Sequence, residues 1–428
     1  MKLLTDITPL REYPAFRRLW LGTMLSQVGS SMTNFALTLQ VWEMTRSTAA
    51  VGVLGVATLV PMLLIALPGG SLADTVDRRK LILAMTACQT AVSGLLFAQA
   101  LIGPGPAGLW LLYALEAASS AMGAISAPAR RTLIPALVPQ RQLAPAMALN
   151  RIVFQTMMIA GPALGGVVAG ASGVKGCYLL DVITFAGSFY GVGRLPAMPP
   201  KRTGDRARGK LALSLEGLGF IRRSQVLAGA FLADVTATFF GLPLSLFPAI
   251  NAARFGGDPR ILGLMPAAIG VGGMVTAVLA GPVRHVSRQG LGMLVCVAVW
   301  GLSFAVFAVA PSLWLTLLAL AIAGAADTYT VVFRGVIVQT VTPDEFRGRV
   351  NAADYVVGAG GGQLGSLEAG LVGSLTTPVI SALSGGLLTV AGAIAIGASL
   401  PAFRRYREPA QPAATRAAED AAAVPQPG

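Results

Sequence analysis

Charged residues are scarce in this chain of 428 residues: only 12% of them are Asp, Glu, Lys or Arg. A soluble domain carries about 25%. Hydrophobic residues make up 54% of the chain, and the mean hydropathy is +0.68. The scarcity of charge excludes an ordinary soluble domain and indicates a protein that is mostly embedded in a lipid bilayer.

Residues that commonly serve catalysis and metal binding are also few. The chain has one histidine, His285, and its three cysteines, Cys88, Cys177 and Cys296, are too scattered for a metal site or a disulfide framework. An intramembrane hydrolase needs a nucleophile with a base, or two metal-binding histidines, which one loop histidine does not provide. The Gly-x-x-x-x-Gly-Lys-Ser/Thr loop that binds ATP is absent as well. We therefore expect no enzymatic activity, no cofactor and no metal.

Apolar runs long enough to cross a membrane are abundant, since a helix needs about 20 residues to do so. Twelve such runs predict an all-α membrane protein with twelve transmembrane helices. They cover residues 19–42, 49–73, 81–102, 108–129, 146–171, 177–196, 226–251, 261–283, 290–311, 312–337, 350–376 and 379–402.

The net charge of +13 is distributed unevenly between the two sides of this predicted bundle. With the N-terminus inside, 28 of the 32 Lys and Arg residues fall on the cytoplasmic side, and only Arg46, Lys175, Arg254 and Arg260 fall outside. Such an asymmetry sets orientation in the membrane, so the basic charge does not indicate nucleic-acid binding. Both termini are expected in the cytoplasm. The excess of Arg over Lys suggests a GC-rich bacterial gene and hence the plasma (inner) membrane.

A basic segment poor in apolar residues, 199–210, follows the sixth run and leads into a short amphipathic stretch, 211–223. We expect a cytoplasmic linker with an interfacial helix at this point. The predicted domains are an N-terminal six-helix bundle, the linker, a C-terminal six-helix bundle and a disordered cytoplasmic tail, at residues 1–196, 197–225, 226–402 and 403–428.

The two halves resemble each other in sequence. A shift of 204 residues superposes Arg130 on Arg334, Pro139 on Pro343 and Gly161 on Gly365. Transporters are often built from such parallel repeats, so we expect two pseudo-symmetric bundles.

A charge-dense turn is expected between the second and third runs, where acids and bases can neutralise each other near the hydrocarbon. Its pattern, Gly-x-Leu-Ala-Asp-x-x-x-Arg-Arg, resembles the corresponding loop of the major facilitator superfamily of secondary transporters. The resemblance implies the twelve-helix facilitator fold and a gating role at the cytoplasmic end. The residues concerned are Gly70, Asp74, Asp77, Arg78 and Arg79.

Two further motifs extend this resemblance. In the fifth run, Gly161, Pro162, Gly165 and Gly166 resemble the helix-kink motif of proton-coupled facilitator exporters, and glycines there would allow close helix packing. The segment 342–350, preceded by Phe333-Arg334-Gly335, resembles a drug:proton antiporter branch that includes the enterobactin exporter. In this predicted C-half loop, acids and bases could form an ion cluster between the halves, or a solvated turn; they are Arg334, Asp344, Glu345, Arg347 and Arg349.

Acidic residues inside the apolar runs are the candidates for proton coupling and substrate binding. A carboxyl group in low dielectric holds its proton more tightly than one in water, as a proton relay requires. In the facilitator fold the first, fourth, seventh and tenth helices line the cavity, which favours Glu116, Asp234 and Asp327; Glu368 is a further candidate, and Asp181 is expected to be structural. The alternative role for each is helix–helix hydrogen bonding. A polar stripe on the first run adds Gln27 and Asn34.

The predicted function is secondary active transport. We expect export of a small amphipathic molecule, a siderophore or an antibiotic-like compound, in exchange for protons by alternating access. A proton-coupled symporter for uptake is the alternative, and an intramembrane enzyme or a receptor fits less well. The expected partners are the substrate, protons and the lipid bilayer, with no nucleic acid, and the protein is expected to be a monomer.

Overall fold

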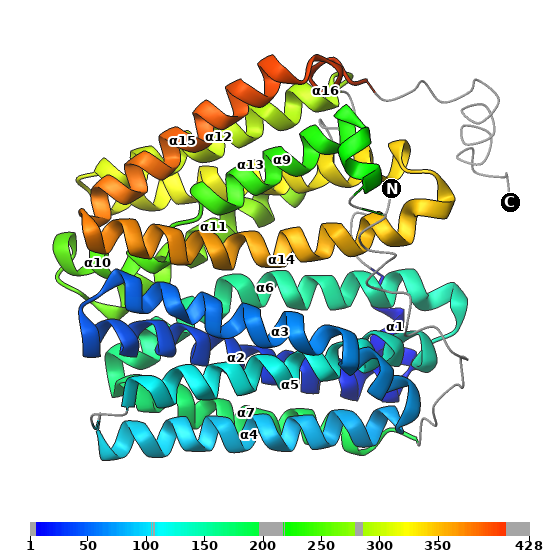
Figure 1. Ribbon diagram of the computed structural model, residues 1–428. Coiled ribbons are helices and arrows are strands. Elements are labelled where there is room, and N and C mark those ends of the chain that lie inside the picture. Colours follow the sequence, from blue (N-terminus) through cyan, green and yellow to red (C-terminus); the bar gives the residue numbers. More distant parts are fainter. Residues whose placement is uncertain are drawn as a thin grey trace, which may run out of the picture.

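All regular secondary structure in the described residues is helical. The computed structural model describes residues 6–103, 105, 108–196, 217, 219–278 and 286–407, with only the backbone for 66–74, 355 and 359. A chain in lipid must satisfy its backbone hydrogen bonds internally, and the long apolar runs do so as helices. Figure 1 shows them lying side by side in two layered halves.

Within the described residues each half contains six spanning segments, which confirms the predicted twelve. After the short α1 (Thr8–Glu12), the first half contains α2 (Pro14–Thr45), α3 (Thr48–Thr75), α4 (Arg78–Ile102), α5 (Gly108–Leu137), α6 (Gln140–Ser172) and α7 (Val174–Gly193). The second half contains α9 (Gln225–Phe240) with η1 (Leu244–Leu246) and α10 (Phe247–Arg254), then α11 (Pro259–Val278), α12 (Gln289–Val309), α13 (Leu313–Val341), α14 (Asp344–Leu375), α15 (Pro378–Ser399) and the short α16 (Pro401–Arg404).

Nine of these segments are long and apolar enough, within the described residues, to qualify as membrane spans by length and hydropathy alone. The other three, α2, α7 and α14, are more polar. α2 and α14 contribute polar side chains to the cavity described below, and α7 carries the buried Asp181.

The seventh span is broken, where the sequence predicted one helix over 226–251. α9 ends at Phe240, and Gly241 adopts its C-cap position against the indole of Trp300. Pro243 has no backbone N–H to continue the helix, so a short 3-10 turn links α9 to α10. The break lies beside the cavity.

The helices run alternately between two ends of the bundle. The arginine-rich end includes Arg78 at the start of α4, Arg141 at the start of α6 and Arg347 at the start of α14. The arginine-poor end includes the connections after α2, α4, α6, α10, α12 and α14.

The two halves are in direct contact toward the arginine-poor end. α14 packs along α3, and the Thr48 hydroxyl donates a hydrogen bond of 2.8 Å to the carbonyl oxygen of Gly370. α6 packs along α11, and a Cβ atom at Gly166 would lie 2.5 Å from the carbonyl oxygen of Pro259. The structure is therefore closed at this end.

The same contacts display the predicted repeat. Pro139 and Pro343 occupy the N-cap positions of α6 and α14, the fifth helix of each half. Gly161 of α6 lies against α2, and Gly365 of α14 lies against α9, which are the first helices of their halves. Equivalent glycines thus permit equivalent close approaches.

We predict that Gly166→Ala destabilises the protein, because the added methyl group would collide with the backbone of α11, which cannot rotate away. Overpacking of this kind costs about 1–3 kcal/mol. Gly123→Ala on α5 is the matched control, since its Cβ would have no atom within 4 Å and alanine favours a helix by roughly 0.5–1 kcal/mol. Thermal unfolding of the purified variants measures the difference. Equal unfolding midpoints for the two variants would show that α6 and α11 can move apart at Gly166 without loss of stability.

Candidate functional site

A cavity of about 610 Å³ lies between the two halves, near the middle of the helices that form it. Its wall is mainly apolar, with aromatic side chains from α2, α10 and α12, and its polar groups come from α2, α9 and α13. Apolar walls with a few polar groups are typical of small-molecule sites. The lining residues that matter below are Asn34, Phe35, Thr38, Asp234, Phe247, Trp300, Asp327 and Arg334.

Arg334 of α13 is the central charge of this cavity. Its guanidinium forms an ion pair with Asp234 of α9, and its Nε lies 3.3 Å from the Oδ1 of Asp354 on α14. The Arg334 and Asp234 side chains are only 11% and 5% exposed, whereas that of Asp354 is 35% exposed. One arginine therefore links three helices of the second half, and removing it would leave the buried Asp234 carboxylate without a partner.

Asp327 lies on the same face of α13, seven residues before Arg334, and lines the same cavity. Within the described part of the chain no hydrogen bond or ion pair of Asp327 is found. Two carboxyl groups thus contact the guanidinium, and a third lines the same cavity. If all were ionised, the cluster would carry a net charge of −2, so it can accept protons or a cationic group.

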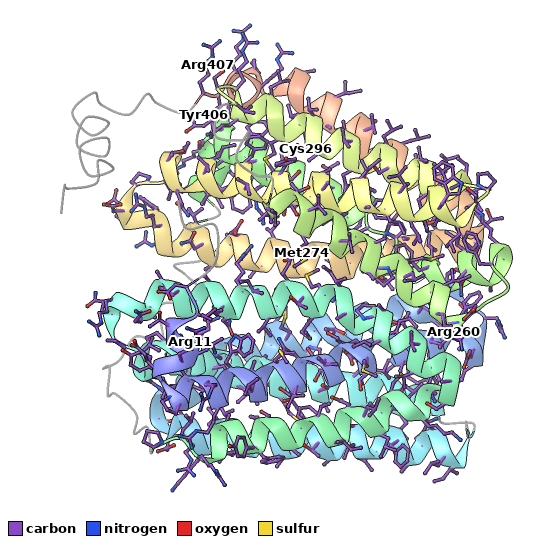
Figure 2. All side chains as sticks on the ribbon, turned by 180° about the vertical axis from the view of Figure 1, so that it is seen from behind. Arg11, Arg260, Met274, Cys296, Tyr406 and Arg407 are labelled. Carbon is purple, nitrogen blue, oxygen red and sulfur yellow. The ribbon has the colours of Figure 1, made fainter. Side chains whose placement is uncertain are left out.

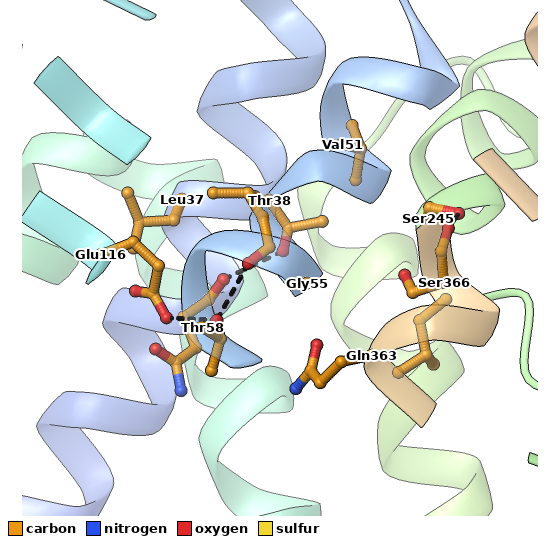
Figure 3. A pocket seen from close by; sticks show the side chains of 12 residues that line it. Leu37, Thr38, Val51, Gly55, Thr58, Glu116, Ser245, Gln363 and Ser366 are labelled. Carbon is orange, nitrogen blue, oxygen red and sulfur yellow. Dashed lines mark hydrogen bonds between the residues drawn. The ribbon is translucent and has the colours of Figure 1, made fainter. Parts of the chain in front are cut away.

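A second lobe of about 240 Å³ adjoins the first, and Asn34, Thr38 and Leu244 line both. It contains Glu116 of α5, whose Oε1 accepts a hydrogen bond of 2.7 Å from the hydroxyl of Thr58 on α3 (Figure 3). Gln363 of α14 faces it from the other half. Each half therefore contributes acidic groups to one continuous central space.

Sequence reasoning missed two residues of this site. Trp300 lies mid-helix in α12, is 4% exposed, and donates a hydrogen bond of 3.1 Å from Nε1 to the Ala237 carbonyl. Its position in the middle of the predicted run 290–311 was the signal that it lies inside the bundle rather than at a membrane interface. Asp354 gave no signal, because it lies close to the polar start of its predicted span.

Comparison with known proteins identifies the family of this chain. A family model described as "transmembrane secretion effector" matches residues 4–421, nearly the whole chain. The chain belongs to this family of the major facilitator superfamily. Curated relatives include the enterobactin exporter EntS of Citrobacter koseri, 29% identical over 407 residues that cover 95% of this chain and 96% of the relative. EntS of Salmonella typhi is 29% identical, with 95% and 97% of the two chains covered.

Solved structures show the same fold at low sequence identity. The nucleoside transporter NupG superposes with a TM-score of 0.65 at 16% identity, covering 92% of this chain and all of its own. A bacterial homologue of the iron transporter ferroportin gives 0.65 at 14% identity, covering 92% and 99%. The predicted facilitator fold is confirmed, and this secretion effector is a multi-pass membrane transporter rather than an enzyme.

The candidate acids of this protein differ in whether they line the cavity. Glu116, Asp234 and Asp327 line the cavity. Asp234 differs from the other two in pairing with a base, Arg334. Glu368, on α14 nearer the arginine-poor end, is not among the lining residues of either lobe.

Asp181 has the structural position that was expected. Its carboxylate is 2% exposed and accepts hydrogen bonds of 2.9 Å from Thr33 and 2.7 Å from Ser93, joining α7 to α2 and α4. Ser30 of the polar stripe also faces this carboxylate, at 3.5 Å. Of the two stripe residues proposed for the site, Asn34 lines the cavity and Gln27 is not among its lining residues.

The charge-dense turn is shorter than predicted. α3 continues through Thr75, so Gly70 and Asp74 are helical, and their side chains lie outside the described part. Asp77 caps α4 by accepting a hydrogen bond of 3.1 Å from the Lys80 backbone N–H. Arg78 begins α4, and the Arg79 guanidinium donates to the Gly193 carbonyl at the end of α7.

The predicted C-half loop is likewise helical. α14 begins at Asp344, directly after Pro343, so Asp344, Glu345, Arg347 and Arg349 occupy its first turns. Asp344 and Arg347 form an exposed ion pair of 2.7 Å within this one helix, rather than across the interface between halves. The Arg349 guanidinium stacks on the Phe346 ring. Arg334 belongs to the cavity and not to this segment.

Two glycines of the helix-kink motif pack closely against neighbouring helices. Gly165 of α6 touches the Phe35 ring of α2, and Gly166 touches Gly263 of α11. Pro162 itself lines the cavity. Residues 197–216 and 218 of the predicted linker 197–225, His285, and residues 408–428 of the predicted tail 403–428 lie outside the described residues.

Proposed function

We propose that this protein exports a small amphipathic molecule, of the siderophore class, in exchange for protons by alternating access. The cavity between the halves carries this proposal, because it combines aromatic walls with more acids than bases. The relatives named enterobactin exporters support the substrate class. Phe35, Phe247 and Trp300 offer flat apolar surfaces to the rings of such a compound, while its polar groups meet Asn34 and Thr38.

The charge balance of the cluster supports the proposed proton exchange. Arg334 can neutralise one carboxylate fully, and Asp234 is its most buried partner. Asp327 is then the group whose proton is held when the cavity is dry and released when it is wet. Substrate and proton would compete for this site, which couples the two movements.

The orientation we propose places the arginine-rich end and both termini in the cytoplasm, because the side with more Lys and Arg faces inward. The structure, closed at the arginine-poor end, would then represent a state open to the cytoplasm. Chemical labelling of Lys175→Cys in a variant without native cysteines tests this orientation. Labelling by an impermeant reagent only from the cytoplasmic face would reject it.

The charged segment between α3 and α4 would act in the opposite state. We propose that Asp74, with Arg78 and Arg79, joins the cytoplasmic ends of the halves when the cavity opens outward. The positive end of the α14 helix dipole would favour a nearby carboxylate by roughly 0.3–1 kcal/mol. Asp74→Asn should then lower transport while expression remains normal.

The test of the function is transport into inside-out membrane vesicles from cells that lack their own siderophore exporter. Enterobactin should accumulate when an imposed gradient makes the vesicle interior acidic, and an uncoupler should abolish the accumulation. Asp344→Asn, at an 85% exposed position, is the control expected to behave as wild type. Accumulation that persists with the uncoupler would rule out proton exchange, and accumulation by intact cells would favour the symport alternative.

A further inference from the structure

A second charged cavity lies far from the transport site, at the arginine-rich end of the second half. It measures about 490 Å³ and is lined by Arg288, Leu291, Arg404, Arg405 and Arg407. Arg288 directly precedes α12, and the other three arginines belong to or follow α16. Figure 2 shows Arg407 and Tyr406 at the outer tip of this half, where basic side chains project from the ribbon. We call these five residues the basic cleft.

The wall of the basic cleft is held in place by packing and hydrogen bonding. Phe403 of α16 is fully buried and lies against Gly229 of α9. Gly290 lets the start of α12 approach the Phe403 carbonyl so closely that no larger residue would fit without a shift. The hydroxyl groups of Tyr406 and Thr340 lie 2.7 Å apart in a hydrogen bond. The arginines therefore project from a fixed turn rather than from a loose end.

Among the described residues, no carboxylate lines the basic cleft, and its four arginines form no ion pair. Like charges gathered in one cleft repel each other unless an anion joins them. Guanidinium groups bind phosphate oxygens by paired N–H donors, so a phosphate is the anion that suits this set.

The apolar surface next to the cleft indicates where that phosphate comes from. Leu291 belongs both to the cleft and to a row of exposed apolar side chains on one face of α12, which continues with Val295, Val299 and Leu302. The spacing of three and four residues keeps this row on one side of the helix. A ligand in the cleft thus has arginines at one end and a lipid-facing stripe at the other.

We propose that the basic cleft binds the phosphate headgroup of an anionic phospholipid, whose acyl chains lie along the exposed face of α12. Basic pockets at this membrane level are known to hold such headgroups in general. A soluble phosphate compound would use the arginines but leave the adjoining apolar stripe unused. The site is independent of the transport cavity and of the proposed substrate.

Native mass spectrometry of the purified full-length protein tests this lipid site. Phosphatidylglycerol and phosphatidylcholine are added in separate titrations, and retained lipid is counted. The cleft variant is Arg404→Gln with Arg405→Gln and Arg407→Gln. The control variant, Arg11→Gln with Arg17→Gln and Arg141→Gln, removes the same charge from exposed positions at the same end of the bundle. Inorganic phosphate alone is titrated in a third arm.

Wild type and control should retain one phosphatidylglycerol, and the cleft variant should bind it at least about tenfold more weakly. Phosphatidylcholine should bind weakly to all three. Equal loss in both triple variants would reduce the effect to general surface charge and overturn the site. Inorganic phosphate that binds as tightly as the lipid would assign the cleft to a soluble compound instead. If the triple variant does not fold, Arg288→Gln on the opposite wall must weaken the lipid severalfold, or the proposal fails.

Discussion

Replacing Arg334 by glutamine is expected to abolish proton-driven export and to destabilise the protein. The substitution leaves Asp234, which is almost fully buried, without its basic partner, and it removes the link to Asp354. Breaking a buried ion pair from one side costs about 3–5 kcal/mol. The loss should appear as a lower midpoint of thermal unfolding and as no uncoupler-sensitive transport in vesicles.

A double variant separates the structural part of this effect from the functional part. Arg334→Gln combined with Asp234→Asn removes both charges, so the two neutral side chains can hydrogen-bond and much of the lost stability should return. Transport should not return, because the Arg334 guanidinium that balances the remaining carboxyl groups of the cavity is still missing. Non-additive stability changes are the expected signature of residues in contact. If the double variant is as unstable as Arg334→Gln alone, the unpaired Asp234 carboxylate is not the cause of the lost stability.

The helices and their pairing could be predicted largely from the sequence. Apolar runs of membrane length fix where helices form, since lipid leaves the backbone no other partners. The shift that aligns Pro139 with Pro343 correctly predicted that α6 and α14 are equivalent. The three cavity acids could be selected because carboxyl groups are rare at such depth and the family resemblance supplied the lining helices.

The partners of those acids could not be predicted in the same way. Arg334 was grouped with the polar segment that follows it because of the motif resemblance, although the predicted run 312–337 already contains it. α13 in fact extends to Val341, which keeps Arg334 two turns inside the helix. The partners of the guanidinium depend on how α9, α13 and α14 are rotated about their axes. The hydropathy of the sequence does not predict these rotations. The break after Phe240 was missed because its apolar residues continue the hydrophobic pattern without interruption.

The second large effect is expected for Asp327→Asn, which should fold normally and yet lose proton coupling. Asp327 has no hydrogen-bond or ion-pair partner among the described residues, so the amide removes no contact that holds the helices together. An amide also has the size and neutrality of a protonated carboxyl group. The variant should therefore unfold at the wild-type temperature, while uncoupler-sensitive export of enterobactin falls to background.

Asp181→Asn provides the matched control for this variant, because it is the same chemical change at a buried acid with the opposite assignment. The Asp181 carboxylate accepts hydrogen bonds from hydroxyl groups on two neighbouring helices, so an amide there should lower the free energy of unfolding by about 1–3 kcal/mol. Proton coupling should remain intact in the Asp181→Asn protein that folds. Glu116→Gln should lower stability less than Asp181→Asn, since the amide oxygen can still accept the hydrogen bond from the Thr58 hydroxyl. If Asp327→Asn, Glu116→Gln and Asp234→Asn all keep wild-type proton-driven export, coupling resides elsewhere, and Glu368 becomes the next residue to replace.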